Sequence, residues 1–161
     1  MASHDSNANG VVTYDLGEAI DFYAFGQILD MEDSEDTNFT IEILYGYFEQ
    51  AEETFQKMDK ALKERDLDEL CRLGHFLKGS SATIGLAKVR DSCEKIQRYG
   101  KKENADGSPE PDEELCLTNI GSTLNIVKSE YTDGRKLLLD YLKGYYGRRQ
   151  AQAQAQDAAR A

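Results

Sequence analysis

The most constraining feature of this chain is a set of apolar residues that recur every three or four positions over long segments. The longest series lies in residues 117–145, and two shorter ones lie in residues 41–62 and 86–100. The members are Ile41, Leu44, Phe48, Ala51, Phe55, Met58 and Leu62; Leu86, Val89, Cys93, Ile96 and Gly100; and Leu117, Ile120, Leu124, Val127, Tyr131, Gly134, Leu138, Tyr141 and Tyr145. This spacing places each series on one face of an α-helix. The three faces predict a buried core rather than a cofactor site.

A fourth helix is predicted around His75. At about 100° per residue, Leu70, Leu73, Leu77 and Ile84 form one stripe on the side opposite His75. The imidazole is therefore expected on the solvent-facing side of an amphipathic helix.

Signals at the helix ends agree with this division. Asp66 with Glu69 three positions later predicts the start of the His75 helix. Gly85 and Gly100 are expected to end two helices, and residues 103–112 read as a loop. Four helices joined by short connections predict the all-α class, with the helices packed as an antiparallel four-helix bundle.

The segments outside the four helices are less regular. Residues 18–31 predict a short extra N-terminal helix whose apolar residues cover more than one face. Such a helix could cap the bundle and still expose a patch for a partner. We expect one domain over residues 15–147, a flexible terminus at 1–14 and a low-complexity tail at 148–161 that either extends the last helix or frays.

Charge and cysteine usage exclude several classes of function. The formal net charge is −11, which argues against nucleic acids and anionic membranes as partners. Cys71, Cys93 and Cys116 are widely spaced and form no metal-ligand pair, so free thiols in a reducing compartment are expected. No signal peptide or membrane-spanning run is recognised. We therefore expect a monomer without metal, located in the cytoplasm and the nucleus.

The surroundings of His75 suggest a contact surface. The residues within about 60° of it on the helix are Cys71, Arg72, Lys78, Gly79 and Ala82. An exposed histidine or lysine alone is usually only a surface residue. A glycine inside a helix, however, costs about 0.5–1 kcal/mol relative to alanine. Gly79 beside an exposed imidazole therefore indicates that another macromolecule approaches closely.

Two sequence blocks resemble a known family. Residues 75–82 read HFLKGSSA, and this run resembles the signature of the histidine-containing phosphotransfer (HPt) domain. Residues 93–101 read CEKIQRYGK and are similar to the next helix of the fungal branch, the phosphorelay intermediates of osmosensing two-component pathways. The resemblance covers residues 15–146, and the C-terminal extension does not match the family.

The resemblance implies a phosphoryl carrier. His75 would accept a phosphoryl group from the receiver-domain aspartate of a hybrid sensor histidine kinase and pass it to the receiver domain of a response regulator. Lys78 would stabilise the added charge, and Gln97 would orient the imidazole ring. Gly79 and Ala82 would leave room for the receiver. The supporting candidates are Lys78, Gly79, Ser80, Ala82, Gln97 and Lys101.

No cofactor is expected on this chain. The resemblance implies that the receiver domain brings Mg²⁺ and an acidic pocket. The sequence has no glycine-rich nucleotide loop, so the protein should not phosphorylate itself from ATP. It would be a phosphohistidine carrier rather than a self-sufficient enzyme. The candidates for partner docking are Ile28 and Met31 in the N-terminal helix and Phe76 beside the histidine.

Other functions predict different features. A general-base enzyme would need a carboxylate near His75, and the sequence shows none on that face. A di-metal bundle would need Glu-x-x-His pairs on two helices, but His4 and His75 are the only histidines. A helical adaptor that binds signalling partners without phosphotransfer is the more serious alternative. It would use residues 18–31 for binding and leave His75 idle.

Overall fold

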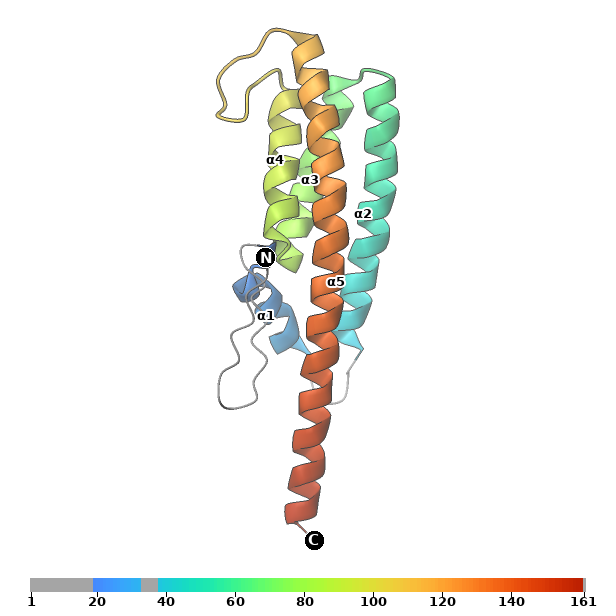
Figure 1. Ribbon diagram of the computed structural model, residues 1–161, viewed down its shortest axis with the longest axis vertical. Helices are drawn as coiled ribbons and strands as arrows, with labels where there is room; N and C mark the ends of the chain where they lie inside the picture. Colours follow the sequence, from blue (N-terminus) through green and yellow to red (C-terminus); the bar gives the residue numbers. More distant parts are fainter. Residues whose placement is uncertain (1–18, 33–37, 161) are drawn as a thin grey trace.

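The computed structural model describes residues 19–32 and 38–160, which contain five α-helices and no β-strand longer than an isolated bridge. The helices are α1 (Phe22–Met31), α2 (Phe39–Lys63), α3 (Leu67–Ile84), α4 (Ala87–Gly100) and α5 (Glu113–Ala159). Helices α2 to α5 run antiparallel and form the bundle, while α1 lies at one end of it, against α3 (Figure 1). The predicted antiparallel four-helix bundle with a short N-terminal helix is confirmed.

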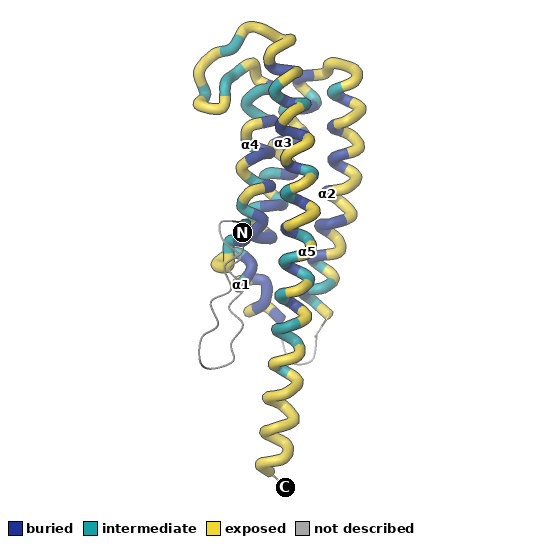
Figure 2. Tube along the Cα trace, in the orientation of Figure 1, coloured by how far each residue is buried: buried dark blue, intermediate teal, exposed yellow. Residues whose placement is uncertain are grey.

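The predicted apolar stripes form the core. Buried residues follow the inward faces of the four long helices (Figure 2). The largest fully buried side chains include Leu44, Phe48, Met58, Leu70, Leu77, Val89, Ile96, Ile120, Leu124 and Leu138. Truncating a buried leucine to alanine costs about 2–5 kcal/mol. The same stripes that predict the helices therefore hold them together.

Both predicted ends of α3 are confirmed. The Asp66 side chain caps the helix start by accepting a hydrogen bond from the backbone N–H of Glu69 at 3.1 Å. Gly85 ends the helix in a left-handed conformation with φ of 92°. A Cβ there would lie 2.6 Å from the carbonyl oxygen of Asp21, so glycine is required twice over. The chain before α1 thus packs on the end of the His75 helix.

Gly100 ends α4 as predicted, but for a different reason. The residue with positive φ beyond this helix is Lys102, at 60°. A Cβ on Gly100 would lie 2.7 Å from the backbone nitrogen of Cys71 and 2.8 Å from its Cβ. The glycine is needed because α3 and α4 approach closely at this point.

Helix α1 corrects two expectations. It begins at Phe22 rather than near residue 18, because Asp21 caps it by accepting hydrogen bonds from the backbone N–H groups of Tyr23 and Ala24. Ile28 is only 6 % exposed and belongs to the core, so its assignment to a docking patch is wrong. One face of α1 packs into the bundle, and Ile28 lies on that face.

The C-terminal segment extends the last helix. α5 continues to Ala159, and every residue from Gln150 to Arg160 is exposed (Figures 1 and 2). The N-terminal segment 1–14 lies outside the described residues. Among the helices of the described part, none has both the length and the apolar composition needed to cross a membrane.

Candidate functional site

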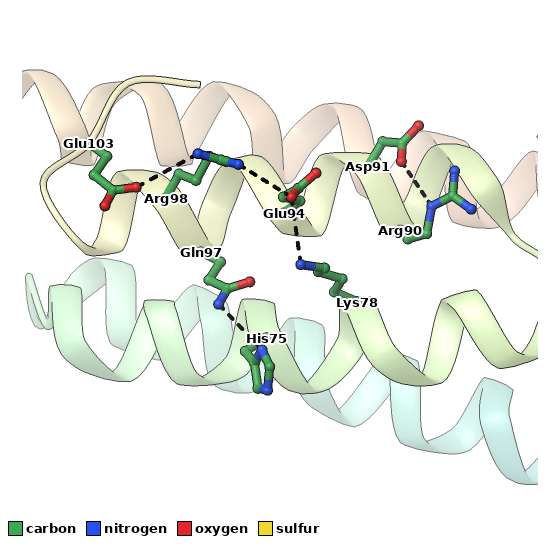
Figure 3. A network of polar contacts seen from close by, with 8 residues as sticks. All are labelled: His75, Lys78, Arg90, Asp91, Glu94, Gln97, Arg98 and Glu103. Carbon is green, nitrogen blue, oxygen red and sulfur yellow. Dashed lines mark hydrogen bonds and ion pairs between the residues drawn. The ribbon is translucent and has the colours of Figure 1, made fainter. Parts of the chain in front are cut away.

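His75 lies on the solvent-facing side of α3, as predicted. Its neighbours Leu73 and Leu77 are buried on the opposite side of the helix, whereas His75 is exposed. The ring Nδ1 is 3.3 Å from the side-chain nitrogen of Gln97 on α4 (Figure 3). Within residues 19–32 and 38–160, the other ring nitrogen, Nε2, has no hydrogen-bond partner. One nitrogen is therefore oriented by the protein, and the other is open to a partner.

A glycine on α3 brings Gln97 within reach. A Cβ on Gly74 would lie 3.0 Å from the carbonyl oxygen of Cys93 and 3.0 Å from the backbone nitrogen of Gln97. Both are backbone atoms, so a larger residue would push the two helices apart. Gly74 precedes His75 directly, and the close approach it allows sets the position of Gln97 relative to the imidazole.

The Gln97 amide suits either tautomer of His75. Its nitrogen faces Nδ1 and donates to it when the imidazole proton is on Nε2. Attack by Nε2 requires the other tautomer, with the proton on Nδ1. A half turn of the amide then presents its oxygen to accept from Nδ1–H. Gln97 can thus hold the ring in the nucleophilic tautomer without adding charge.

Lys78 takes part in a chain of ion pairs. Its Nζ is 3.6 Å from Oε1 of Glu94, which also lies 3.6 Å from Nη2 of Arg98 (Figure 3). Nη1 of Arg98 is in turn 4.0 Å from a carboxylate oxygen of Glu103. Such partly exposed pairs contribute about 0–1 kcal/mol, so Lys78 is held weakly. A group beside His75 with more negative charge than a carboxylate can therefore compete for it.

Glu94 was missed by the sequence reasoning, which found no carboxylate on this face. The residue comes from the neighbouring helix, and only the pairing of α3 with α4 brings it beside Lys78. Within the described residues, its ion-pair partners are Lys78 and Arg98, not His75. The structure therefore adds a carboxylate to the site but does not place it as a partner of the imidazole.

The surface next to His75 is open. A Cβ added to Gly79 would meet nothing within 4 Å, and Ala82 is half-buried. Phe76 is 44 % exposed. The Ser80 hydroxyl is 3.3 Å from the carbonyl oxygens of Phe76 and Leu77, within its own helix. The space where a side chain at position 79 would stand is therefore empty of other described residues, as expected if Gly79 leaves room for a receiver.

Cys71 lies one turn before His75 on α3, and Lys101 lies near Cys71. Lys101 follows the last residue of α4 and is exposed. Burial raises the pKa of the Cys71 thiol, an effect that nearby Lys101 opposes. The thiol one turn before His75 is therefore protonated at neutral pH and a poor nucleophile. In the described part of the chain, no three His, Cys, Asp or Glu side chains are grouped to hold a metal ion.

Helix α1, whose start lies against the end of the His75 helix, carries exposed apolar side chains. Met31 is 67 % exposed, Tyr23 79 % and Phe22 41 %. Met31 therefore remains available as a docking candidate, whereas Ile28 does not. Tyr23 and Phe22 were not singled out from sequence, because the pattern alone did not say which face of α1 is buried.

Residues 42–133 match the family described as Hpt domain, which is more than half of the chain. The chain belongs to the HPt domain family. A similar protein is multistep phosphorelay regulator 1 of Schizosaccharomyces pombe, 42 % identical over 146 residues that cover 84 % of this chain and 50 % of the relative. The phosphorelay intermediate protein YPD1 of Candida albicans is 44 % identical over 87 residues, covering 54 % of this chain and 47 % of the relative. The resemblance to fungal phosphorelay intermediates is confirmed.

The fold is also similar to a solved structure. The Saccharomyces cerevisiae histidine phosphotransfer signalling protein Ypd1, crystallised with the receiver domain of its downstream response regulator Ssk1, has a TM-score of 0.65 and 31 % identity. The match covers 80 % of this HPt protein and 95 % of that chain. The chain spans about half the length of the curated relatives it matches.

Proposed function

We propose that this HPt protein is a phosphorelay intermediate that carries a phosphoryl group on His75. It accepts the group from the receiver-domain aspartate of a hybrid sensor histidine kinase and passes it to the aspartate of a response regulator. The observation that carries the proposal is an exposed imidazole with one nitrogen held by Gln97 and the other open. The structure of Ypd1 with the Ssk1 receiver domain supports a receiver as partner.

The transfer follows from the site geometry. The Nε2 lone pair of neutral His75 attacks the phosphorus of the aspartyl phosphate on the receiver. The N–P bond forms as the P–O bond to the aspartate breaks, and the carboxylate leaves with the electron pair. The imidazole keeps its proton on Nδ1, where the Gln97 oxygen accepts it in a hydrogen bond. Transfer to the second receiver reverses these steps.

Lys78 and Gly79 serve the same step. Lys78 can leave Glu94 and donate to the phosphoryl oxygens, because a phosphoryl group carries more negative charge than the Glu94 carboxylate. Because Gly79 has no side chain, the receiver can approach closely enough for Nε2 to reach an aspartate in its active site. This chain supplies the nucleophile and its orientation. The receiver supplies Mg²⁺ and the acidic pocket, so the protein acts as a carrier. The proposed location is the cytoplasm and the nucleus.

Incubation with a receiver domain that carries radiolabelled phosphate tests the proposal. Wild-type protein should take up label that is lost in acid and survives base, as a phosphohistidine does. His75→Gln should take up none and should keep its helical circular dichroism, because the side chain is exposed. Label on the His75→Gln variant, or none on the wild type, would contradict the proposal and favour a binding adaptor.

A further inference from the structure

A buried carboxylate lies where α1 ends. Glu32 follows Met31 as the C-terminal cap of α1, and its side chain is 0 % exposed. One carboxylate oxygen accepts a hydrogen bond from the Thr40 hydroxyl of α2 at 2.8 Å. The Tyr146 hydroxyl of α5 lies 3.0 Å from each carboxylate oxygen. Nη1 of Arg149 is 4.0 Å from the carboxylate. Glu32 therefore ties the end of α1 to two other helices.

The Tyr146 hydroxyl donates a hydrogen bond to the Glu32 carboxylate. Burial, followed by the hydrogen bond to Glu32, raises the pKa of Tyr146 to about 12. The phenol is therefore protonated at neutral pH and donates to the carboxylate. A buried carboxylate is unfavourable unless hydrogen bonds replace its hydration. Loss of the Tyr146 hydroxyl would thus leave Glu32 short of a donor and favour its movement toward solvent.

α1 is held at further points. Its Phe22 and Phe25 rings contact the Tyr141 ring of α5, with centroids 5.4 Å and 5.8 Å apart. Before α1 begins, the backbone N–H of Asp21 donates to the carbonyl oxygen of Gly85 at 2.7 Å. Figure 1 shows α1 beside the lower half of α5. The start of the helix is thus fixed to the end of the His75 helix, and its end is fixed through Glu32.

We propose that Glu32 and Tyr146 are positioning residues for receiver docking. They hold α1 so that its exposed side chains, Met31 and Tyr23, face a receiver seated over His75. This inference rests on the proposed phosphorelay function. It assigns a role to the part of α5 around Tyr146, which lies beyond the residues 42–133 matched by the family. Neither residue touches the imidazole, so their effect is on docking rather than on the chemical step.

The expected effect is on the KM for the receiver. When α1 is docked in only a fraction of molecules, the apparent dissociation constant rises by the inverse of that fraction. For Tyr146→Phe we expect KM for a phosphorylated receiver domain to rise about fivefold, with kcat at saturation changed less than about twofold. Glu32→Gln should fall between Tyr146→Phe and wild type, because the amide keeps an oxygen to accept from Thr40 or Tyr146.

Tyr145→Phe is the matched control. Tyr145 is the preceding residue, its ring lies 5.5 Å from that of Tyr146, and the hydrogen bonds to Glu32 come from Tyr146 alone of the two. Steady-state transfer from the phosphorylated receiver domain of a hybrid sensor histidine kinase should be measured for both variants. Hydrogen exchange of the amides from Phe25 to Met31 should be compared with that of α3, which reports whether the bundle itself has loosened.

The outcomes separate the possibilities. The inference is supported if Tyr146→Phe shows faster hydrogen exchange in α1, unchanged exchange in α3 and a raised KM. Tyr145→Phe should show none of these changes. Equal KM values for the two variants, or a fall in kcat instead of a rise in KM, overturns it. Wild-type protein that takes no phosphate from the receiver refutes the proposed function itself, whatever α1 exchange shows.

Discussion

Replacing Gly79 should stabilise the protein and impair its function. A Cβ at this position meets nothing within 4 Å, so Gly79→Ala introduces no clash. Alanine is the better helix former, and the gain is about 0.5–1 kcal/mol in the free energy of unfolding. For a domain of this size that gain corresponds to a melting temperature about 1–4 °C higher. Transfer should nevertheless slow, because the new side chain lies where the receiver approaches His75.

Gly74→Ala is the matched control, since the same methyl group is added on the same helix. There the Cβ would lie 3.0 Å from two backbone atoms of α4. Overpacking of this kind costs about 1–3 kcal/mol, more than the gain in helix propensity. The two alanine variants should therefore shift stability in opposite directions. Urea unfolding followed by circular dichroism measures this difference directly.

Transfer assays complete the test. Gly79→Gln, with a longer side chain, should transfer more slowly than Gly79→Ala while keeping its helicity. If both variants had wild-type transfer rates and receiver affinities, Gly79 would not be needed to leave room for the receiver. A loss of stability in Gly79→Ala would show that the position is packed in a way the structure does not describe.

Three further predictions concern other parts of the molecule. Lys78→Ala should slow transfer or shorten the phosphohistidine lifetime without abolishing acceptance, and Gln97→Ala should have a smaller effect on both. The decay of label over time measures these effects. Either variant being as inactive as His75→Gln would contradict these roles. Met31→Gln should weaken receiver binding in titration calorimetry while leaving far-UV circular dichroism unchanged, and unaltered affinity would move the docking surface elsewhere. Between about pH 10 and 12 the unfolded state loses the Tyr146 proton before the folded state does, so the free energy of unfolding falls as pH rises. In urea unfolding over this interval, Tyr146→Phe should therefore lose less stability than Tyr145→Phe. Equal losses would contradict the raised pKa of Tyr146.

The helices were predictable because burial alone decides them. The stripes around Leu44, Ile96 and Leu124 repeat with the helical period, and each is buried where predicted. Asp66 and Gly85 mark the ends of α3 through local hydrogen bonding and backbone geometry. His75 was placed correctly because its angle from Leu73 and Leu77 depends only on its own helix.

Contacts between helices were harder to predict. Glu94 pairs with Lys78 because of the register between α3 and α4, which no spacing within one helix reveals. Ile28 was placed in a docking patch because α1 has apolar residues on more than one side, and only its packing shows which side is buried. Glu32 was not singled out from the sequence, because its partner Tyr146 lies 114 positions away and only the packing of α5 against α1 brings the two together.

The central claim is that His75 relays phosphate between two receivers, and a reconstituted relay tests it most directly. A labelled receiver domain, this HPt protein and a second, unlabelled receiver are mixed, and label on each is followed over time. The proposal predicts label on the second receiver only when the protein is present, with labelled protein as an intermediate, and none with His75→Gln. Equal transfer with His75→Gln, or label that stops on the wild-type protein, would contradict the account.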